Sequence, residues 1–235
     1  MALKLIGYPS TIRRIQAPVI MRMLSVGAMD RVLDAGCGLG LFTQEIAKKC
    51  RCTGIDLGVN SSHAYAAART QNAGYLKADL RQIPLKDGSF DRILLSSVLQ
   101  MVTDDRHLLD QCNSLLKTKG VLVLSVPHNY VTVTKLNGLK TGLSRQFGVE
   151  GKGYYQPAEI LALLEKCGFT VIETEYSPKL LGSLVYESWL YFCYKTGLPL
   201  YHPLYFLLLY PLAFSDRFLG KSSPGNELII KAEKR

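Results

Sequence analysis

Short apolar runs alternate with amphipathic stretches along the chain from residue 31 onward. The apolar runs are rich in Val, Ile and Leu and are bounded by Gly, Asp or Pro, as is typical of buried parallel strands. We expect strands at residues 31–35, 52–56, 75–78, 91–96, 121–126, 169–176 and 228–232, and helices at residues 41–49, 61–71, 104–116 and 157–167. The alternation predicts an α/β fold, a three-layer sandwich with helices on both faces of a mostly parallel sheet.

Residues typical of helix ends lie at the predicted boundaries. Asn60 and Gln156 suit N-terminal caps, Pro157 suits a first helical turn, and Gly168 suits a C-terminal stop. These signals support the predicted limits of two helices, at residues 61–71 and 157–167.

The composition is that of one globular domain covering residues 1–235. The chain is 48% hydrophobic and 20% charged, which disfavours disorder, collagen and a long coiled coil. Its 28 Lys and Arg exceed its 19 Asp and Glu, giving a net charge of +9, and such an excess attracts polyanions. Seven of these net charges lie within residues 1–31 and 135–152. We expect a basic helical segment at residues 1–30, either facing an anionic partner or simply solvated.

The cysteines and the N-terminus indicate a cytosol-facing protein. Six cysteines are spread through the chain without the dense spacing of a disulfide scaffold, so we expect reduced thiols. Cys50 and Cys52 have no second pair at zinc-site spacing, so we predict no metal site. Residues 1–14 lack the apolar run of a secretory signal.

The segment VLDAGCGLGLF, residues 32–42, carries the strongest chemical signal. A strand pattern leads into Gly36, Gly38 and Gly40, and a helix pattern follows. Glycine at such positions allows a tight turn and a close approach of a ligand to the main chain. Nicotinamide and flavin folds use a related pattern, so the neighbouring residues must decide between cofactors.

Three carboxylates follow three successive strands and favour a cationic cofactor. Asp34 stands just before the glycines, where it would repel a pyrophosphate and attract an ammonium group. Asp56 lies 18 residues after Gly38, at a strand end where a carboxylate can accept hydrogen bonds from ribose hydroxyls. Asp79 follows the third strand and can accept a hydrogen bond from an adenine amino group.

With these motifs, the chain resembles the class I S-adenosylmethionine-dependent methyltransferases, in particular the branch with ubiquinone and menaquinone biosynthesis enzymes. The segments that carry the resemblance are VLDAGCGLG, GIDLG, KADLRQIPLKDGSFDRILLSSVLQMV, LKTKGVLVLSVP and EILALLEKCGF. The resemblance implies S-adenosylmethionine as cofactor, S-adenosylhomocysteine as product, and a seven-stranded sheet in the order 3-2-1-4-5-7-6 with the last strand antiparallel.

The same resemblance implies a set of cofactor-binding residues. The methionine portion would be held by the loop with Asp34, Gly36, Cys37, Gly38 and Gly40, and Ser96 would lie beside it. Asp56 would bind the ribose. The adenine would be bound by Asp79 and the Leu80 backbone, with Leu57 packed on the face of the ring. Many relatives carry Glu-His after the fourth strand, whereas this chain has Gln100 and Met101. That departure removes one candidate acid or base.

Methyl transfer from a sulfonium depends mainly on positioning the nucleophile, with removal of a proton where the nucleophile is a hydroxyl. His128, just after the fifth strand, is the candidate base, and an ordinary loop histidine is the alternative. Gln100, Asn129, Tyr130 and Tyr155 are the candidates for the acceptor pocket. An Asn/Asp-Pro-Pro-aromatic loop and a Pro-Cys nucleophile are both absent from the sequence, which disfavours nucleic acid as substrate.

Residues 183–222 form an apolar aromatic insert between the sixth and seventh strands. Half of the chain's aromatic residues, 11 of 22, lie between residues 183 and 219. Prolines at positions 199, 203 and 211 interrupt the uncharged run, so we expect a helical hairpin lying in one leaflet rather than a span. A buried helix pair or a homodimer interface are the alternatives.

The sequence predicts a peripheral membrane methyltransferase acting on a hydrophobic acceptor such as a prenylated quinone, phenol or other lipid. An anionic membrane surface is the expected partner, because the two basic segments would border the substrate mouth. A soluble small-molecule or RNA methyltransferase with the insert as dimer interface is one alternative. A cofactor-binding partner subunit without catalysis is the other.

Overall fold

The chain folds around one seven-stranded sheet. The computed structural model describes residues 11–60, 63, 66–67, 70–128, 152–196, 211, 215–220 and 225–235. The strands are β1 (Arg31–Ala35), β2 (Arg51–Asp56), β3 (Ala73–Lys77), β4 (Phe90–Ser96), β5 (Leu116–Pro127), β6 (Phe169–Tyr176) and β7 (Glu227–Lys234). Their order is β3-β2-β1-β4-β5-β7-β6. Strands β1 to β5 are parallel and β7 is antiparallel to both neighbours, which confirms the predicted fold.

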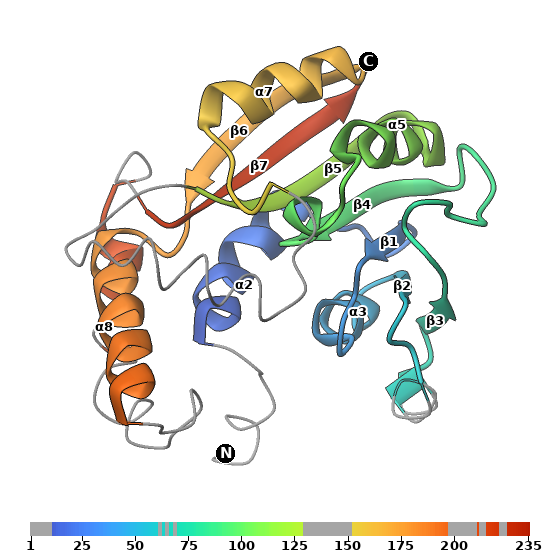
Figure 1. Cartoon of the computed structure of the whole chain (residues 1–235). Helices are drawn as coiled ribbons and strands as arrows, with labels where there is room; N and C mark the ends of the chain where they lie inside the picture. The colour runs from blue at the N-terminus through green and yellow to red at the C-terminus, as the bar shows by residue number, and fades with distance from the viewer. Residues whose placement is uncertain are drawn as a thin grey trace.

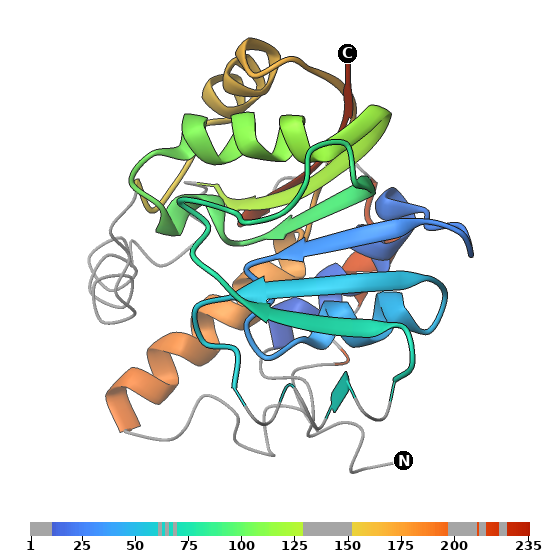
Figure 2. The same ribbon diagram turned by 90° about the vertical axis from the view of Figure 1, so that its right-hand side faces the viewer.

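Helices cover both faces of the sheet (Figures 1 and 2). On one face lie α5 (Asp105–Leu115) and α7 (Pro157–Lys166), whose buried side chains join the core formed with β4 and β5. On the other face lie α2 (Thr11–Leu24) and α3 (Leu41–Ala47), which form a second core with β1 and β2. The short 3-10 helix η1 (Leu99–Met101) follows β4.

The predicted element limits are close to those observed, with one clear exception. We expected the fifth strand to begin at residue 121, but β5 begins at Leu116, directly after α5. The polar residues 117–119 hid this extension. Lys119 has a φ of 62°, and the register with β4 shifts between Phe90 and Arg92, so the early part of β5 is irregular. Of the helix expected at residues 61–71, positions 63, 66 and 67 are helical and positions 70 and 71 are not, while the others lie outside the described residues.

A long helix, α8 (Leu180–Thr196), begins the insert between β6 and β7. It contacts α2 and the 3-10 helix η2 (Ser215–Phe218) and extends from the sheet beside α2 (Figure 1). Within the described residues, no helix has the length and apolar character needed to cross a bilayer. The second arm of the expected hairpin and the basic segment at residues 135–151 lie outside the described residues, as do residues 1–10.

Five of the six cysteines are free thiols in the structure. Four of them, Cys50, Cys52, Cys112 and Cys167, are buried, and Cys37 is half-buried in the glycine-rich loop. The expectation that the cysteines lie mostly in the core is confirmed for these five.

Candidate active site

The glycine-rich loop follows β1 at the point where the strand order reverses, which is where α/β sheets bind ligands. Gly36, Gly38 and Gly40 have φ values of 78°, 53° and 76°. A Cβ on Gly36 would clash with Val98, and one on Gly40 would clash with Tyr75. The backbone N–H groups of Gly36 and Cys37 both donate to the carbonyl of Ile55, at 2.8 and 3.0 Å. These contacts hold the loop tightly between β2 and η1, so positions 36 and 40 require glycine.

Asp56, at the end of β2, joins this loop to the next strand. Its Oδ2 accepts a hydrogen bond from the Gly38 N–H at 3.0 Å, and its Oδ1 accepts from the Gly58 N–H at 2.8 Å. Each carboxylate oxygen can accept a second hydrogen bond. Asp56 can therefore shape the loop and still accept hydrogen bonds from the hydroxyls of a sugar.

His63 supports the loop from the helix after β2. Its Nε2 lies 2.6 Å from the carbonyl oxygen of Gly38, and its Nδ1 lies 3.2 Å from the Asn60 backbone N–H. Because the Gly38 carbonyl can only accept, His63 Nε2 carries a proton and donates to it. The peptide of Gly38 is thus held from both ends, by Asp56 and by His63.

A cavity of about 570 Å³ opens beside the loop, within the size range of small-molecule sites. Its lining residues come from α2 and from the carboxyl ends of β1, β2, β3 and β4: Arg13, Gly36, Asp56, Leu57, Asp79, Leu80, Arg81, Ser96, Ser97, Val98, Met101, Val102 and Thr103. Six predicted site residues are among them: Gly36, Asp56, Leu57, Asp79, Leu80 and Ser96. The Leu57 side chain is 60% exposed, so it offers the cavity an apolar face.

Asp79 lines the cavity as half of an ion pair. Its Oδ2 accepts hydrogen bonds from Arg81 Nε and Nη2, at 2.9 and 2.6 Å, and its Oδ1 accepts from the Arg81 backbone N–H at 2.9 Å. These hydrogen bonds hold the pKa of Asp79 below its usual range, so the carboxylate is ionised and available as an acceptor.

Asp34 lies beneath the glycine-rich loop and is not among the residues that line the cavity. It is 2% exposed, and its Oδ2 accepts a hydrogen bond from Thr43 Oγ1 at 2.6 Å. Burial raises the pKa of Asp34 to about 6, against the opposite effects of the Thr43 hydrogen bonds and the charge of Arg13. The structure thus places Asp34 against α3, as a support of the loop.

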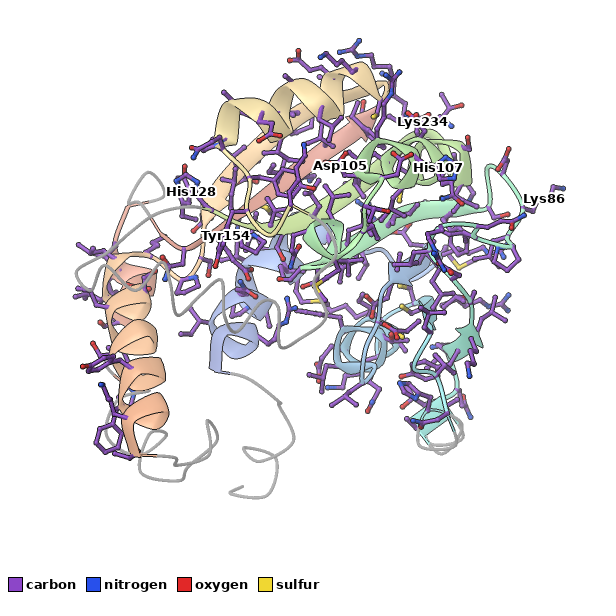
Figure 3. All side chains as sticks on the ribbon, viewed as in Figure 1. Lys86, Asp105, His107, His128, Tyr154 and Lys234 are labelled. Atoms are coloured by element: carbon purple, nitrogen blue, oxygen red, sulfur yellow. The ribbon has the colours of Figure 1, made fainter. Side chains whose placement is uncertain are left out.

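The structure does not bring the predicted acceptor-side residues together at this cavity. His128 Nδ1 lies 3.3 Å from the Tyr155 carbonyl, and its ring packs against Tyr176 at a centroid distance of 5.5 Å. Figure 3 shows His128 on the side of the molecule nearer α8, and it is not among the residues that line the cavity.

Tyr155 and Gln100 are core residues rather than cavity residues. Tyr155 is 2% exposed, and its hydroxyl donates to Asp105 Oδ2 at 3.0 Å. Gln100 is buried within η1. Neither side chain lines the cavity. Asn129 and Tyr130 lie outside the described residues.

Sequence reasoning missed a polar cluster that joins α2 to the ends of β4, β5 and β7. Arg13 Nη1 donates to Ser96 Oγ at 2.5 Å and to Ser97 Oγ at 3.0 Å, and Arg13 Nη2 donates to the Ser96 carbonyl at 3.2 Å. Gln16, one turn along α2, donates to the carboxylate of Glu227 and to the Ser177 carbonyl. The spacing of Arg13 and Gln16 on one helix face was the available signal. Nothing in the sequence pairs them with Glu227.

The chain is similar to known methyltransferases in sequence and in fold. The sequence model of the family described as "Methyltransferase domain" matches residues 33–124. The chain is 30% identical over 144 residues to a Mycolicibacterium smegmatis protein named "Probable S-adenosylmethionine-dependent methyltransferase", covering 61% of this chain and 53% of that protein, so it spans about half the length of that relative. It is 27% identical over 180 residues to a ubiquinone biosynthesis O-methyltransferase of Xanthomonas axonopodis pv. citri, covering 73% and 72% of the two chains.

A solved structure shows the same fold. The N-methyltransferase NodS from Bradyrhizobium japonicum WM9, in complex with S-adenosylhomocysteine, matches with a TM-score of 0.59 and 18% identity, over 96% of this chain and 89% of that chain. In its strand order, in the glycine-rich loop with its partner Asp56, and in these matches, the chain is similar to the class I S-adenosylmethionine-dependent methyltransferases.

Proposed function

We propose that the chain transfers the methyl group of S-adenosylmethionine to a hydrophobic acceptor, such as a lipid, a prenylated quinone or a phenol, at a membrane surface. The cavity at the strand ends is the observation that carries the transfer: Asp56 closes the glycine-rich loop there, and Leu57 stands exposed beside it. The family's cofactor supplies an activated methyl group, so the protein needs chiefly to position the acceptor.

The lining residues fit the parts of this cofactor. In this proposal Asp56 accepts the ribose hydroxyls, Leu57 packs on the adenine ring, and Asp79 accepts the adenine amino group beside the Leu80 backbone. The loop of Gly36, Cys37, Gly38 and Gly40 holds the methionine portion, with the main chain open at Gly38, where a Cβ would meet nothing within 4 Å. Ser96 lines the same region, and the guanidinium of Arg13 is the cation that would pair with the methionine carboxylate.

Asp34 has a different role in this proposal from the one expected from the sequence. Since its carboxyl group is buried against Thr43, it supports the turn between β1 and α3 rather than meeting the ammonium group directly. The local charge still favours a cation, because Asp34 and Asp56 lie on the two strands that hold the loop.

Two observations support a hydrophobic acceptor. On α8, Tyr191 and Phe192 are 44% and 46% exposed, and the aromatic-rich insert continues beyond this helix. The Xanthomonas relative is named a ubiquinone biosynthesis O-methyltransferase. Exposed aromatic side chains on one helix are typical of surfaces that contact a lipid or a protein partner.

Transfer of labelled methyl groups from S-adenosylmethionine to a total lipid extract tests the proposal. We expect label in the organic phase with the wild-type chain and none with Asp56→Ala, which removes the carboxylate that shapes the loop. A labelled product confined to the aqueous phase would instead support a water-soluble acceptor. The absence of any labelled product, together with unimpaired cofactor binding, would support the noncatalytic partner subunit.

A further inference from the structure

Ser97 and Glu227 form a hydrogen-bonded pair at the floor of the proposed methyl-transfer cavity. Ser97 lines the cavity at the end of β4. Its hydroxyl donates to both carboxylate oxygens of Glu227, the first residue of β7, at 3.1 and 3.2 Å. Ser97 also has a φ of 50°, a conformation that a residue other than glycine adopts only when its surroundings impose it.

The direction of each hydrogen bond is fixed by chemistry. Arg13 can only donate, so Ser97 Oγ accepts from Arg13 Nη1 at 3.0 Å and donates its own proton to Glu227. Ser97 Oγ also lies 3.3 Å from Ser125 Oγ, and the Ser125 hydroxyl donates to Glu227. The second lone pair of Ser97 is then left to accept a proton from a ligand in the cavity. Ser97 therefore links the cavity directly to the Glu227 carboxylate.

The surroundings of Glu227 suit a group that takes up a proton. Among the described residues, Arg13 of α2 is the charged group that faces it, and the donors are Gln16 of α2, Ser97 of β4 and Ser125 of β5. Burial raises the pKa of Glu227 above its usual range, while these neighbours lower it. A carboxylate with a raised pKa is a stronger base than a solvated one.

Resting on the proposed methyl transfer, we infer that the acceptor atom is a hydroxyl oxygen and that Ser97 and Glu227 form the relay that receives its proton. As the O–CH3 bond forms and the S–CH3 bond breaks, the acceptor proton passes to Ser97 Oγ, and the proton of Ser97 passes to Glu227. The products are the methyl ether, neutral S-adenosylhomocysteine and protonated Glu227, which returns its proton to solvent. In this scheme Ser97 is the catalytic residue and Glu227 acts through it.

The first test follows turnover against pH with a long-chain alkyl catechol in detergent micelles as acceptor. For the wild type, kcat should rise with pH through the titration of Glu227. Glu227→Gln and Ser97→Ala should each lower kcat about 100-fold, the order of one general-base contribution, and should abolish that rise. The kcat of the double variant should be no lower than that of either single variant, because both residues act in one proton relay.

Glu233→Gln is the control. Glu233 lies on the same strand as Glu227 and is paired with Lys119 at the surface, so this variant should leave kcat and the pH profile unchanged.

A second test does not depend on turnover. Infrared difference spectra between wild type and Glu227→Gln, with S-adenosylhomocysteine bound, report the protonated Glu227 carboxyl directly. Its titration should lie above that of ordinary glutamates and should move to higher pH in Ser97→Ala, because the hydrogen bond to the ionised form is lost. An ordinary titration, or one unmoved by Ser97→Ala, would overturn the relay.

The two failures are distinguishable. If the wild type methylates no acceptor of any class, the proposed function fails, while the infrared titration still decides whether Ser97 and Glu227 are coupled. If the wild type is active and Glu227→Gln keeps its rate and pH profile with the fold intact by circular dichroism, the relay fails and the methyltransferase stands. Losses that multiply in the double variant would assign the two residues separate structural roles and would overturn the relay as well.

Discussion

At the scale of single residues, the site shows carboxylates in three different environments. Asp79 is partly exposed, with 32% of its side chain accessible, and is held ionised by Arg81. Asp56 is half-buried and receives two backbone N–H donors. Asp34 is almost fully buried with Thr43. The sequence placed all three at strand ends but could not distinguish these environments, because burial depends on α3 and on the loop above.

The buried Asp34 should make stability depend on pH. Its pKa is raised from 3.8 to about 6 in the folded protein, so the folded state holds this proton at pH values where the unfolded state has released it. The contribution of Asp34 to stability is therefore largest below its pKa of 3.8 in the unfolded chain, and it is lost as the pH rises through its folded pKa of about 6. Between pH 5 and pH 7.5, this group alone should lower the free energy of unfolding by about 1 kcal/mol.

Urea denaturation of the cofactor-free wild type and of Asp34→Asn, at both pH values, isolates this contribution. The asparagine cannot ionise, so the variant should gain about 1 kcal/mol relative to wild type between pH 5 and pH 7.5. Glu227 titrates in both proteins, and its effect cancels in the difference. If the free energies of unfolding of wild type and Asp34→Asn differ by the same amount at both pH values, Asp34 is ionised, and hence hydrated, in the folded state.

At the scale of elements, the sequence predicted each strand of the described sheet but not which residues meet where the elements end. Hydrophobic runs located β1 to β7 because strands buried on both faces need continuous apolar residues. The residues that meet at the site follow no such pattern. Arg13 and Glu227 are separated by more than two hundred positions, and only the antiparallel insertion of β7 beside β5 brings the start of β7 to the end of β4. Local sequence carries no trace of that contact.

The helix α8 is the element on which the proposed membrane contact can be tested. Its Tyr191 and Phe192 are adjacent and nearly half exposed, with Lys195 Nζ lying 5.7 Å from the Tyr191 ring centroid. If this helix enters a lipid interface, replacing either aromatic with a charge removes apolar burial of about 1.5 kcal/mol or more. We expect Tyr191→Glu and Phe192→Glu each to weaken binding to phosphatidylglycerol-containing vesicles by at least about tenfold.

Met29→Glu is the matched control for this measurement. Met29 is 93% exposed and lies in the loop before β1, on another part of the surface, so its replacement makes the same change in charge without touching α8. Vesicle co-sedimentation should therefore distinguish it from the two α8 variants, and all three should melt close to wild type. Equal binding by all four proteins would rule out α8 as the membrane contact, and loss of a dimer in sedimentation velocity would identify a protein interface instead.

At the scale of the whole molecule, the site is an assembly of elements that are far apart in sequence. The loop after β1, the end of β2, the segment after β3, the end of β4 and the start of α2 all contribute to one cavity. A ligand bound there contacts several strands at once and binds only when they are assembled. Cofactor binding should therefore stabilise the entire fold.

The size of this stabilisation follows from mass action. At a cofactor concentration one hundred times its Kd, the gain is about 2.7 kcal/mol, which for a chain of this length raises Tm by about 5 to 10 °C. Differential scanning fluorimetry with S-adenosylmethionine should show this shift for the wild type. Gly38→Ala should abolish it at the same concentration, because Gly38 has a φ of 53° in the loop where the methionine portion is proposed to lie, and its Cβ would stand in open space there.

Gly88→Ala separates this effect from backbone strain. Gly88 has a φ of 62°, and its Cβ would also meet nothing within 4 Å, but it lies in the loop before β4 and does not line the cavity. Both alanine variants adopt an unfavourable left-handed conformation, so both should lower the Tm of the cofactor-free protein by the equivalent of about 1 kcal/mol. Only Gly88→Ala should then recover the full shift on adding cofactor. If Gly38→Ala recovers it equally, the cofactor does not approach the main chain at Gly38, and the methionine portion must lie elsewhere in the cavity.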